Sequence, residues 1–268
     1  MNEKIPYPVL TIAGSDCSGG AGIQADIKVI SAHGCYAMAA VTSITAQNTV
    51  GVSAIEGVLP DLVSEQIRMV YDDIPPLAVK TGMLFSADIV NAVAMALSDV
   101  NASRLVIDPI MVSTSGSRLI SEEAIEVMVK ELFPLAELVT PNKMEAEVLT
   151  GVTNPKNQGE LLLGMGCNAV LIKGGDSDNN VKEDLLFLPS GEIVALQMPA
   201  VNTPNTHGTG CSLSSAIASN LAKGMTLTAA VEKAKSYVYN ALLSGSTYKI
   251  GQGHGPIDHF YHTDFGCD

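Results

Sequence analysis

Short continuous apolar runs alternate with segments of helical periodicity along most of this chain, and this alternation limits the possible folds more than any other feature of the sequence. Such runs are typical of strands buried on both faces, and their alternation with helices predicts a parallel sheet covered by helices on both faces. The predicted strands are Tyr7–Gly14, Met38–Ala46, Leu77–Gly82, Arg104–Pro109, Glu137–Pro141 and Ala169–Gly175. The predicted helices between them are Gly22–Ala32, Asp61–Tyr71, Ser86–Leu97, Ser121–Phe133, Asn142–Leu149 and Gln158–Met165.

The pattern changes after Gly175. Residues 182–198 predict a β-hairpin that turns at Ser190 and Gly191, and two consecutive helices follow over Cys211–Lys223 and Thr226–Leu243. No proline-rich linker, low-complexity tract or internal repeat divides the sequence. A single domain over residues 1–268 is therefore predicted, a size that α/β folds commonly reach.

The charge balance excludes some partners. The chain has 28 acidic and 15 basic residues, a formal net charge of -13 at pH 7 and a pI near 4.7. Such a surface repels phosphodiester backbones and anionic lipids, so neither nucleic acid nor a membrane is an expected partner. Any positive field that binds a phosphate compound must be local, from a metal ion, a lysine or a helix N-terminus.

The five cysteines, Cys17, Cys35, Cys167, Cys211 and Cys267, are scattered and form no C-x-x-C pair. An odd number without metal-ligand spacing indicates neither a disulfide framework nor a zinc site. The first apolar run is too short to span a membrane and lacks the basic segment and cleavage pattern of a signal peptide. These features favour a cytoplasmic protein.

Polar and glycine residues that follow the predicted strands form the candidate site, because ligands of open parallel sheets bind beyond the carboxyl ends of the strands. The segment NTHGTGCSLSSAIASNLAKG places Gly208, Thr209 and Gly210 at the start of a helix. Glycines let backbone amides turn toward a ligand, and the helix N-terminus adds unpaired N–H groups and a positive dipole end. The segment therefore predicts an anion hole.

Cys211 lies in the first turn of that helix. The same field is expected to lower the pKa of its thiol and to favour the thiolate, which suits a general base or a nucleophile. An ordinary loop followed by a small, buried and inert cysteine explains the same residues.

A second glycine-rich segment, GSDCSGGAGIQADIK, precedes the predicted helix that begins at Gly22. It matches neither the P-loop nor the dinucleotide fingerprint. Asp26 lies about one helical turn after Gly22 and could face the crevice to bind a substrate donor. A flexible turn with Asp26 as a solvated helix charge is the simpler interpretation.

Asn142 and Glu145 have the spacing of a capping box, which by itself explains both residues. Alternatively, they help to hold a magnesium ion or its waters beside a phosphate, together with Asp108, because magnesium prefers hard oxygen ligands. Lys173 follows a predicted strand and either reaches a nucleotide phosphate or is solvated. Their recurrence at successive strand ends favours a phosphate site more than any one of them does.

The histidines give little metal signal. His254, His259 and His262 match no zincin spacing, and surface or tail packing explains them. His207 lies inside the predicted anion-hole segment, where we expect it to shape the loop.

Several motifs together resemble the hydroxymethylpyrimidine and phosphohydroxymethylpyrimidine kinases of thiamine biosynthesis, within the ribokinase-like superfamily. They are AGSDCSGGAGIQADIK, TAQNT, KTGML, DPIMVSTSG, TPNKMEAE, IKGG, NTHGTGCSLSSAIA and GHGP, between about Gly14 and His259. The resemblance implies a ribokinase-like, three-layer α/β/α fold. It also implies an ATP- and Mg²⁺-dependent kinase that phosphorylates hydroxymethylpyrimidine and then its monophosphate to the diphosphate.

The resemblance further implies roles for individual residues. It places the transferring phosphoryl group at the catalytic residues Gly208, Thr209, Gly210 and Cys211, with Cys211 as the base. It places the pyrimidine at Asp26, Gln47, Met83, Gly14 and Gly20, the nucleotide at Lys173, Asn142, Asp108 and Thr209, and the metal at Asp108 and Glu145. One departure is Cys17, where relatives commonly have serine.

Two other functions fit the same scaffold. Pyridoxal or pyridoxine kinases of vitamin B6 salvage are built on it, but some of them carry a second cysteine where this chain has Ser113. A non-catalytic pyrimidine-binding sensor would not need the complete catalytic set that is present here. By analogy with the superfamily a homodimer is expected, and a lid is expected over Ser113–Ser117.

Overall fold

The computed structural model describes residues 6–111, 119–177 and 180–263, and these residues build one nine-stranded sheet in the order β3-β2-β1-β4-β5-β6-β7-β8-β9. The six central strands pair in parallel: β2 (Cys35–Gln47), β1 (Tyr7–Asp16), β4 (Ala78–Thr81), β5 (Leu105–Ile107), β6 (Leu138–Val139) and β7 (Val170–Ser177). The outer strands β3 (Val52–Gly57), β8 (Val181–Phe187) and β9 (Ile193–Pro199) pair antiparallel with their neighbours.

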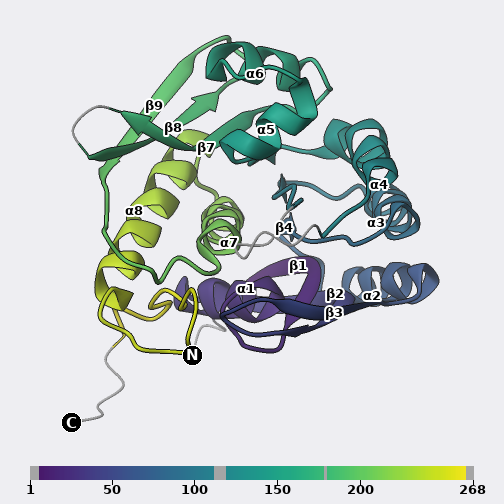
Figure 1. Ribbon diagram of the computed structural model, residues 1–268. Coiled ribbons are helices and arrows are strands. Elements are labelled where there is room, and N and C mark those ends of the chain that lie inside the picture. The colour runs from purple at the N-terminus through teal and green to yellow at the C-terminus, as the bar shows by residue number, and fades with distance from the viewer. Residues whose placement is uncertain (1–5, 112–118, 178–179, 264–268) are drawn as a thin grey trace, which may run out of the picture.

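Helices cover both faces of this sheet (Figure 1). One face packs against α1 (Gly22–Ala32), α7 (Thr209–Ala222) and α8 (Leu227–Gly245). The other packs against α2 (Pro60–Asp73), α3 (Ala87–Asp99), α4 (Glu122–Val127), α5 (Lys143–Thr150) and α6 (Pro155–Leu163). Because strand side chains alternate between faces, Val9 contributes to the first core and Leu10 to the second. The three-layer α/β/α prediction is confirmed.

The strand that the sequence did not indicate is β3. Ser53, Ala54 and Glu56 are exposed, so this edge strand has no continuous apolar run. It forms because Ser43–Gln47 of β2 offers its free edge, and the two segments pair antiparallel. The turn between them holds Gln47 at the end of β2.

One predicted helix is divided. The segment expected over Ser121–Phe133 forms α4 and then a π-helical turn over Met128–Leu132, with a short 3-10 turn after it. Ser121 caps α4 by accepting a hydrogen bond from Ala124 N. This region packs over α3 and lies away from the candidate site.

Within the described ranges no helix is both long enough and apolar enough to cross a membrane. The expected lid over Ser113–Ser117 lies outside the described residues. A single domain over residues 1–268 stays a prediction, which the continuous sheet favours.

Candidate active site

A cavity of about 700 Å³ opens where the carboxyl ends of the parallel strands meet the start of α7. This is the place at which open parallel sheets bind ligands, and the volume suits a small-molecule site. Most residues singled out from the sequence line it: Gly14, Gln47, Met83, Asp108, Asn142, Glu145, Lys173, Gly208, Thr209, Gly210 and Cys211. Gly20 and Asp26 are not among the lining residues.

The N-terminus of α7 faces this cavity. Gly208 is its N-cap, with a φ of 80° in the left-handed region, and it makes no side-chain capping hydrogen bond. A Cβ at Gly208 would collide with the Gly20 carbonyl oxygen, so only glycine fits here. The first turn of α7 therefore directs backbone N–H groups and the positive end of the helix dipole at the cavity, as an anion hole requires.

Lys173 and Asp108 form an ion pair beside that helix start. Lys173 Nζ lies 2.6 Å from Asp108 Oδ1, and Ser214 Oγ donates to Asp108 Oδ2 over 3.3 Å. A Cβ at Gly210 would lie 3.5 Å from both Asp108 Oδ2 and Lys173 Nζ, which fixes the pair against α7. Burial opposes the charge of Lys173, but Asp108 and Glu145 raise its pKa. The lysine is therefore a cation held at the anion hole.

Asn142 and Glu145 form the capping box that the sequence predicts. Asn142 Oδ1 accepts from Glu145 N over 2.9 Å, and Glu145 Oε2 accepts from Asn142 N over 2.8 Å. Burial and the charge of Asp108 raise the pKa of Glu145 to about 6, although Lys173 opposes this rise. The capping hydrogen bonds explain both residues locally, while the burial of Glu145 at the cavity exposes its carboxylate to the charge of Asp108.

Asp108 and Glu145 fit a magnesium ion by their chemistry. Both present carboxylate oxygens to one cavity. Burial is the main cause of the raised pKa of Glu145, and the charge of Asp108 adds to it. The described residues contain no group of three or more histidine, cysteine, aspartate or glutamate side chains that could hold a metal. Magnesium needs only one or two carboxylates when substrate phosphates and waters complete its shell.

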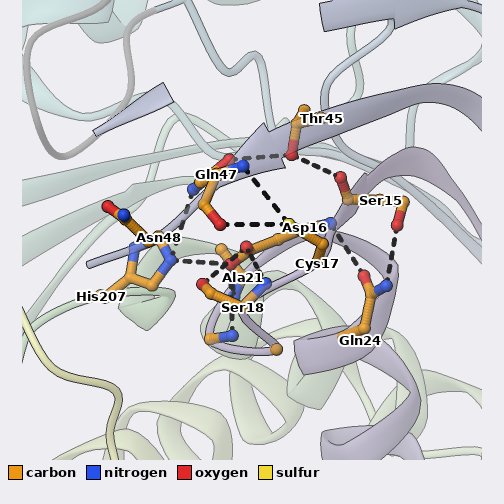
Figure 2. A network of polar contacts seen from close by, with 12 residues as sticks. Ser15, Asp16, Cys17, Ser18, Ala21, Gln24, Thr45, Gln47, Asn48 and His207 are labelled. Carbon is orange, nitrogen blue, oxygen red and sulfur yellow. Dashed lines mark hydrogen bonds and ion pairs between the residues drawn. The ribbon is translucent and has the colours of Figure 1, made fainter. Parts of the chain in front are cut away.

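The loop after β1 is organised by Asp16, a residue that sequence reasoning did not single out (Figure 2). Its Oδ1 accepts from Ser18 N over 2.9 Å, and its Oδ2 accepts from Ala21 N over 2.8 Å and from His207 Nε2 over 2.8 Å. Aspartate that bonds the backbone two residues later is a common turn former, so the Ser-Asp-x-Ser pattern was an available signal. His207 therefore links this loop to the start of α7, in agreement with the expectation that it shapes the loop.

Gln47 lines the cavity next to that loop. Its Oε1 accepts from Thr45 Oγ1 over 3.2 Å, and its Nε2 lies 3.4 Å from His207 Nε2. The Cys17 thiol donates to Gln47 O over 3.1 Å and accepts from Gln47 N over 3.3 Å (Figure 2). The Cys17 side chain thus fixes the backbone that carries Gln47.

Two glycines assigned to the substrate act differently. A Cβ at Gly14 would lie 2.5 Å from Met83 Cε and 2.6 Å from Ser43 Oγ, so Gly14 lets Met83 approach the cavity wall. Gly20 donates from its N–H to Asp16 Oδ2 over 3.2 Å, and a Cβ there would overlap the His207 ring. Gly20 therefore shapes the loop and does not line the cavity.

The placement of Asp26 corrects both interpretations from the sequence. Asp26 is neither solvated nor on the cavity, since its side chain has 0% exposure and pairs with Lys80 at 2.8 Å. Thr11 and Ser215 donate to the same carboxylate over 2.6 and 2.7 Å. An aspartate enclosed by these donors has no room to contact a substrate.

The ionisation expected for Cys211 is also wrong for the ligand-free chain. Burial raises the pKa of the Cys211 thiol to about 11, although the Lys80 ammonium and the Gly22 N–H lower it. Desolvation is the largest of these effects, because a thiolate loses its hydration inside the protein. Cys211 lines the cavity but is mostly protonated at neutral pH.

Comparison with known proteins adds a family to this geometry. The family model described as phosphomethylpyrimidine kinase matches residues 16–258. The hydroxymethylpyrimidine/phosphomethylpyrimidine kinase of Rhizobium meliloti is 44% identical over 258 residues, 94% of this chain and 96% of that protein. A thiamine biosynthesis bifunctional protein of Geobacter sulfurreducens is 43% identical over 97% of this chain and 54% of its own length.

Solved structures show the same similarity. A phosphomethylpyrimidine kinase from Clostridium difficile superposes with a TM-score of 0.77 at 44% identity, over 88% of this chain and 99% of that chain. Pyridoxal kinase from Staphylococcus aureus in complex with AMP-PCP and pyridoxal gives a TM-score of 0.86 at 32% identity, over 97% and 95% of the two chains. The ribokinase-like fold expected from the motifs is confirmed.

Proposed function

The chain belongs to the phosphomethylpyrimidine kinase family, and on that premise we propose that the cavity at the start of α7 is its active site. The protein is a hydroxymethylpyrimidine/phosphomethylpyrimidine kinase, a phosphotransferase of thiamine biosynthesis. One observation carries the assignment of the site: the N-terminus of α7, the Lys173 cation and the Cys211 thiol line the same cavity.

ATP is the proposed phosphoryl donor. Lys173, Asn142 and Thr209 would hold its phosphates, because they surround the helix start that carries the positive dipole end. The AMP-PCP complex of the Staphylococcus aureus pyridoxal kinase supports a nucleotide triphosphate in this scaffold. Asp108 would set the position of the Lys173 ammonium.

Mg²⁺ is the proposed metal, and Asp108 and Glu145 would hold it. When bound, the ion supplies positive charge that neutralises phosphate oxygens. Asp108 reaches this position from the end of β5 and Glu145 from the first turn of α5. The capping hydrogen bonds orient the Glu145 carboxylate before any ligand arrives.

In the first reaction the substrate hydroxyl oxygen forms a bond to the γ-phosphorus, and the bond from that phosphorus to the bridging oxygen of the leaving ADP breaks. Phosphoryl transfer passes through a loose transition state, so positioning and stabilisation of the transferring oxygens dominate the rate. The N–H groups of Gly208, Gly210 and Cys211 and the Lys173 ammonium supply that stabilisation, whereas the Thr209 N–H donates to Thr206 O. Cys211, in its thiolate form, accepts the hydroxyl proton and becomes a neutral thiol.

The second reaction places different demands on Cys211. Its nucleophile is a phosphate oxygen, which is ionised near neutrality because the second pKa of a phosphomonoester is about 6. No proton then has to be removed. The two steps therefore share the anion hole and differ in their need for a base.

Gln47 and Met83 are the proposed contacts of the pyrimidine ring. Gln47 offers an amide to the polar edge of the ring, and Met83, which follows β4, offers an apolar surface to the same cavity. The Asp16–His207 contact keeps the substrate side of the cavity aligned with the start of α7. This alignment brings the hydroxymethyl group and the anion hole to one place.

The test is ADP release with ATP and Mg²⁺, offering hydroxymethylpyrimidine, its monophosphate and pyridoxal separately. Turnover of both pyrimidines with much slower pyridoxal turnover would support the proposal. Fast pyridoxal turnover with inactive pyrimidines would replace it by vitamin B6 salvage, for which the fold similarity to pyridoxal kinases is the supporting observation. Ser113, which argued against that alternative, lies outside the described residues.

A cytoplasmic location and a homodimer complete the proposal. Cys17, Cys35, Cys167 and Cys211 are free thiols, as a reducing compartment favours. Apolar side chains such as Ile44 are exposed on the surface and would be covered in a dimer. Light scattering of the purified protein measures the assembly directly.

A further inference from the structure

Lys80 and Asp26 form an ion pair inside the molecule, between the sheet and α7. Lys80 Nζ lies 2.9 Å from Asp26 Oδ1 and 2.8 Å from Asp26 Oδ2, and both side chains have 0% exposure. Together with the donors Thr11 and Ser215, side chains from β1, α1, β4 and α7 meet at one carboxylate. None of these four residues lines the cavity.

Strand and helix periodicities place this pair against the face of α7 that carries Cys211. Lys80 shares a strand face with Ala78, which packs in the core that contains α1 and α7. Ser215 lies four residues after Cys211 on α7, so their side chains project from the same side. The charges that act on Cys211 come from Lys80 on β4, Asp26 on α1, Asp108 after β5 and Lys173 on β7.

The position of the Lys80 ammonium is fixed. A Cβ at Gly82 would lie 2.7 Å from Lys80 Nζ, so the chain leaves this space open for the ammonium. Burial opposes the charge, but Asp26 and Cys211 raise the pKa of Lys80 above its ordinary value. Lys80 is therefore a permanent cation at a defined place below the start of α7.

The stability of the fold gives little reason for a charged pair at this place. Removing two charges from water costs about as much as their attraction returns, and apolar residues of similar volume often stabilise a core equally well. A cation near a thiol in a low-dielectric interior, in contrast, changes the proton affinity of the thiol strongly. Of the charged groups that act on Cys211, Lys80 has the largest effect.

We propose that Lys80 and Asp26 are positioning residues for the kinase reaction: the buried Lys80 ammonium stabilises the thiolate form of Cys211, and Asp26 fixes that ammonium and limits its effect. The proposal deepens the proposed function, because it rests on Cys211 as the base of the first phosphorylation. It also gives Asp26 a part in catalysis without contact to the substrate.

The experiment measures the pKa of the Cys211 thiol in full-length variants. The rate of its alkylation by iodoacetamide, followed at the Cys211 peptide by mass spectrometry, is recorded from neutral pH up to the Cys211 pKa of about 11. Below its pKa the rate is proportional to the thiolate fraction, so rate ratios at one pH report differences in pKa. The variants are Asp26→Asn, which leaves the Lys80 charge uncompensated, and Lys80→Met/Asp26→Asn, which removes both charges. Lys223→Met is the matched control, because it removes a lysine charge at the opposite end of α7.

Asp26→Asn is expected to lower the thiol pKa by at least about one unit, which makes alkylation at neutral pH at least about tenfold faster. The double variant is expected to raise the pKa above that of the unmodified protein, because Lys80 acts on Cys211 more strongly than Asp26 does. Lys223→Met should leave it unchanged. The double variant keeps the test valid if Asp26→Asn fails to fold.

Equal thiol pKa values in the unmodified protein and the folded double variant would overturn the proposal. The titration needs no kinase activity, so its failure is distinct from failure of the proposed function. A kcat/KM pH profile for hydroxymethylpyrimidine that shifts with the thiol pKa, while the profile for the monophosphate does not, would tie the pair to the first reaction. A purely structural role for Lys80 would move neither the thiol pKa nor this profile.

Discussion

His207 donates a hydrogen bond from Nε2 to Asp16 Oδ2 over 2.8 Å, and this contact joins the loop after β1 to the residue that precedes the N-cap of α7 (Figure 2). Burial by itself would raise the pKa of Asp16, but hydrogen bonds from His207, Ser18 and Ala21 lower it to about 2. Asp16 is therefore ionised at neutral pH. The Asp16 carboxylate therefore fixes the loop after β1, on the substrate side of the cavity, relative to the start of α7, on the phosphate side.

Removal of this contact is expected to slow both phosphorylations. Asp16→Asn and His207→Gln should each lower kcat/KM by roughly 10- to 100-fold, because a hydrogen bond to a charged group contributes about 1.5–3 kcal/mol. The double variant should lose little more than either single variant, since the two residues act through one contact. Steady-state kinetics of the four proteins measure this, and additive losses would show that the residues act separately.

Cys211→Ala is expected to separate the two reactions. Phosphorylation of the alcohol should fall by about 10²–10⁴, the usual contribution of a general base, while phosphorylation of the monophosphate should change far less. Single-turnover rates for both substrates measure this. Cys167→Ala, at a second buried thiol outside the cavity, is the control. Equal losses in both steps would contradict the assignment of Cys211 as a base.

The two reactions should also differ in pH dependence. A base must be deprotonated, and burial raises the pKa of Cys211 to about 11. For hydroxymethylpyrimidine, kcat/KM should therefore rise by about tenfold per pH unit from neutral pH toward that pKa. For the monophosphate it should level off above the phosphate pKa of about 6. If kcat/KM levelled off above the same pH for both substrates, Cys211 would not be the base of the first step.

Gly208→Ala is expected to disrupt the anion hole. Its Cβ would collide with the Gly20 carbonyl oxygen, so the start of α7 must move, and kcat should fall by about 10²–10³ as on loss of an oxyanion donor. Gly224→Ala is the matched control, because Gly224 also has a positive φ but open space around a Cβ. The control should lose stability and keep its activity. Similar kcat values for both variants would contradict this account of Gly208.

Acid should destabilise the fold before most carboxylates titrate. Burial lowers the pKa of His33 and of His259 from 6.5 to about 4, and neighbouring lysines add to this. Between these values the unfolded chain binds protons that the native chain does not, so the free energy of unfolding falls as pH decreases from about 6.5 to about 4. Urea midpoints across this range measure it. His33→Gln should flatten the slope, whereas exchange of the exposed His254 for Gln should not.

The sequence by itself determined the layers of the fold and the strand ends around which the cavity is built. Strand and helix patterns depend on residues close in the chain, which is why α1 begins and ends at the predicted residues Gly22 and Ala32. The capping box of Asn142 and Glu145 was readable for the same reason. Residues that follow the parallel strands reach the cavity because the topology itself brings strand ends together. The edge strand β3 was not predicted because its pairing with β2, not its own composition, makes it a strand.

Only the tertiary structure decided which charged residues line the cavity and which lie in the core beneath it. The pattern of α1 leaves open whether Asp26 faces the crevice. The ion pair with Lys80, 54 residues later in the chain, holds Asp26 in the core. His207 and Asp16 meet across 191 residues. The high pKa of Cys211 follows from burial, which no local spacing reveals. Charge interactions depend on distance and dielectric in three dimensions, and both are set when separate elements pack together.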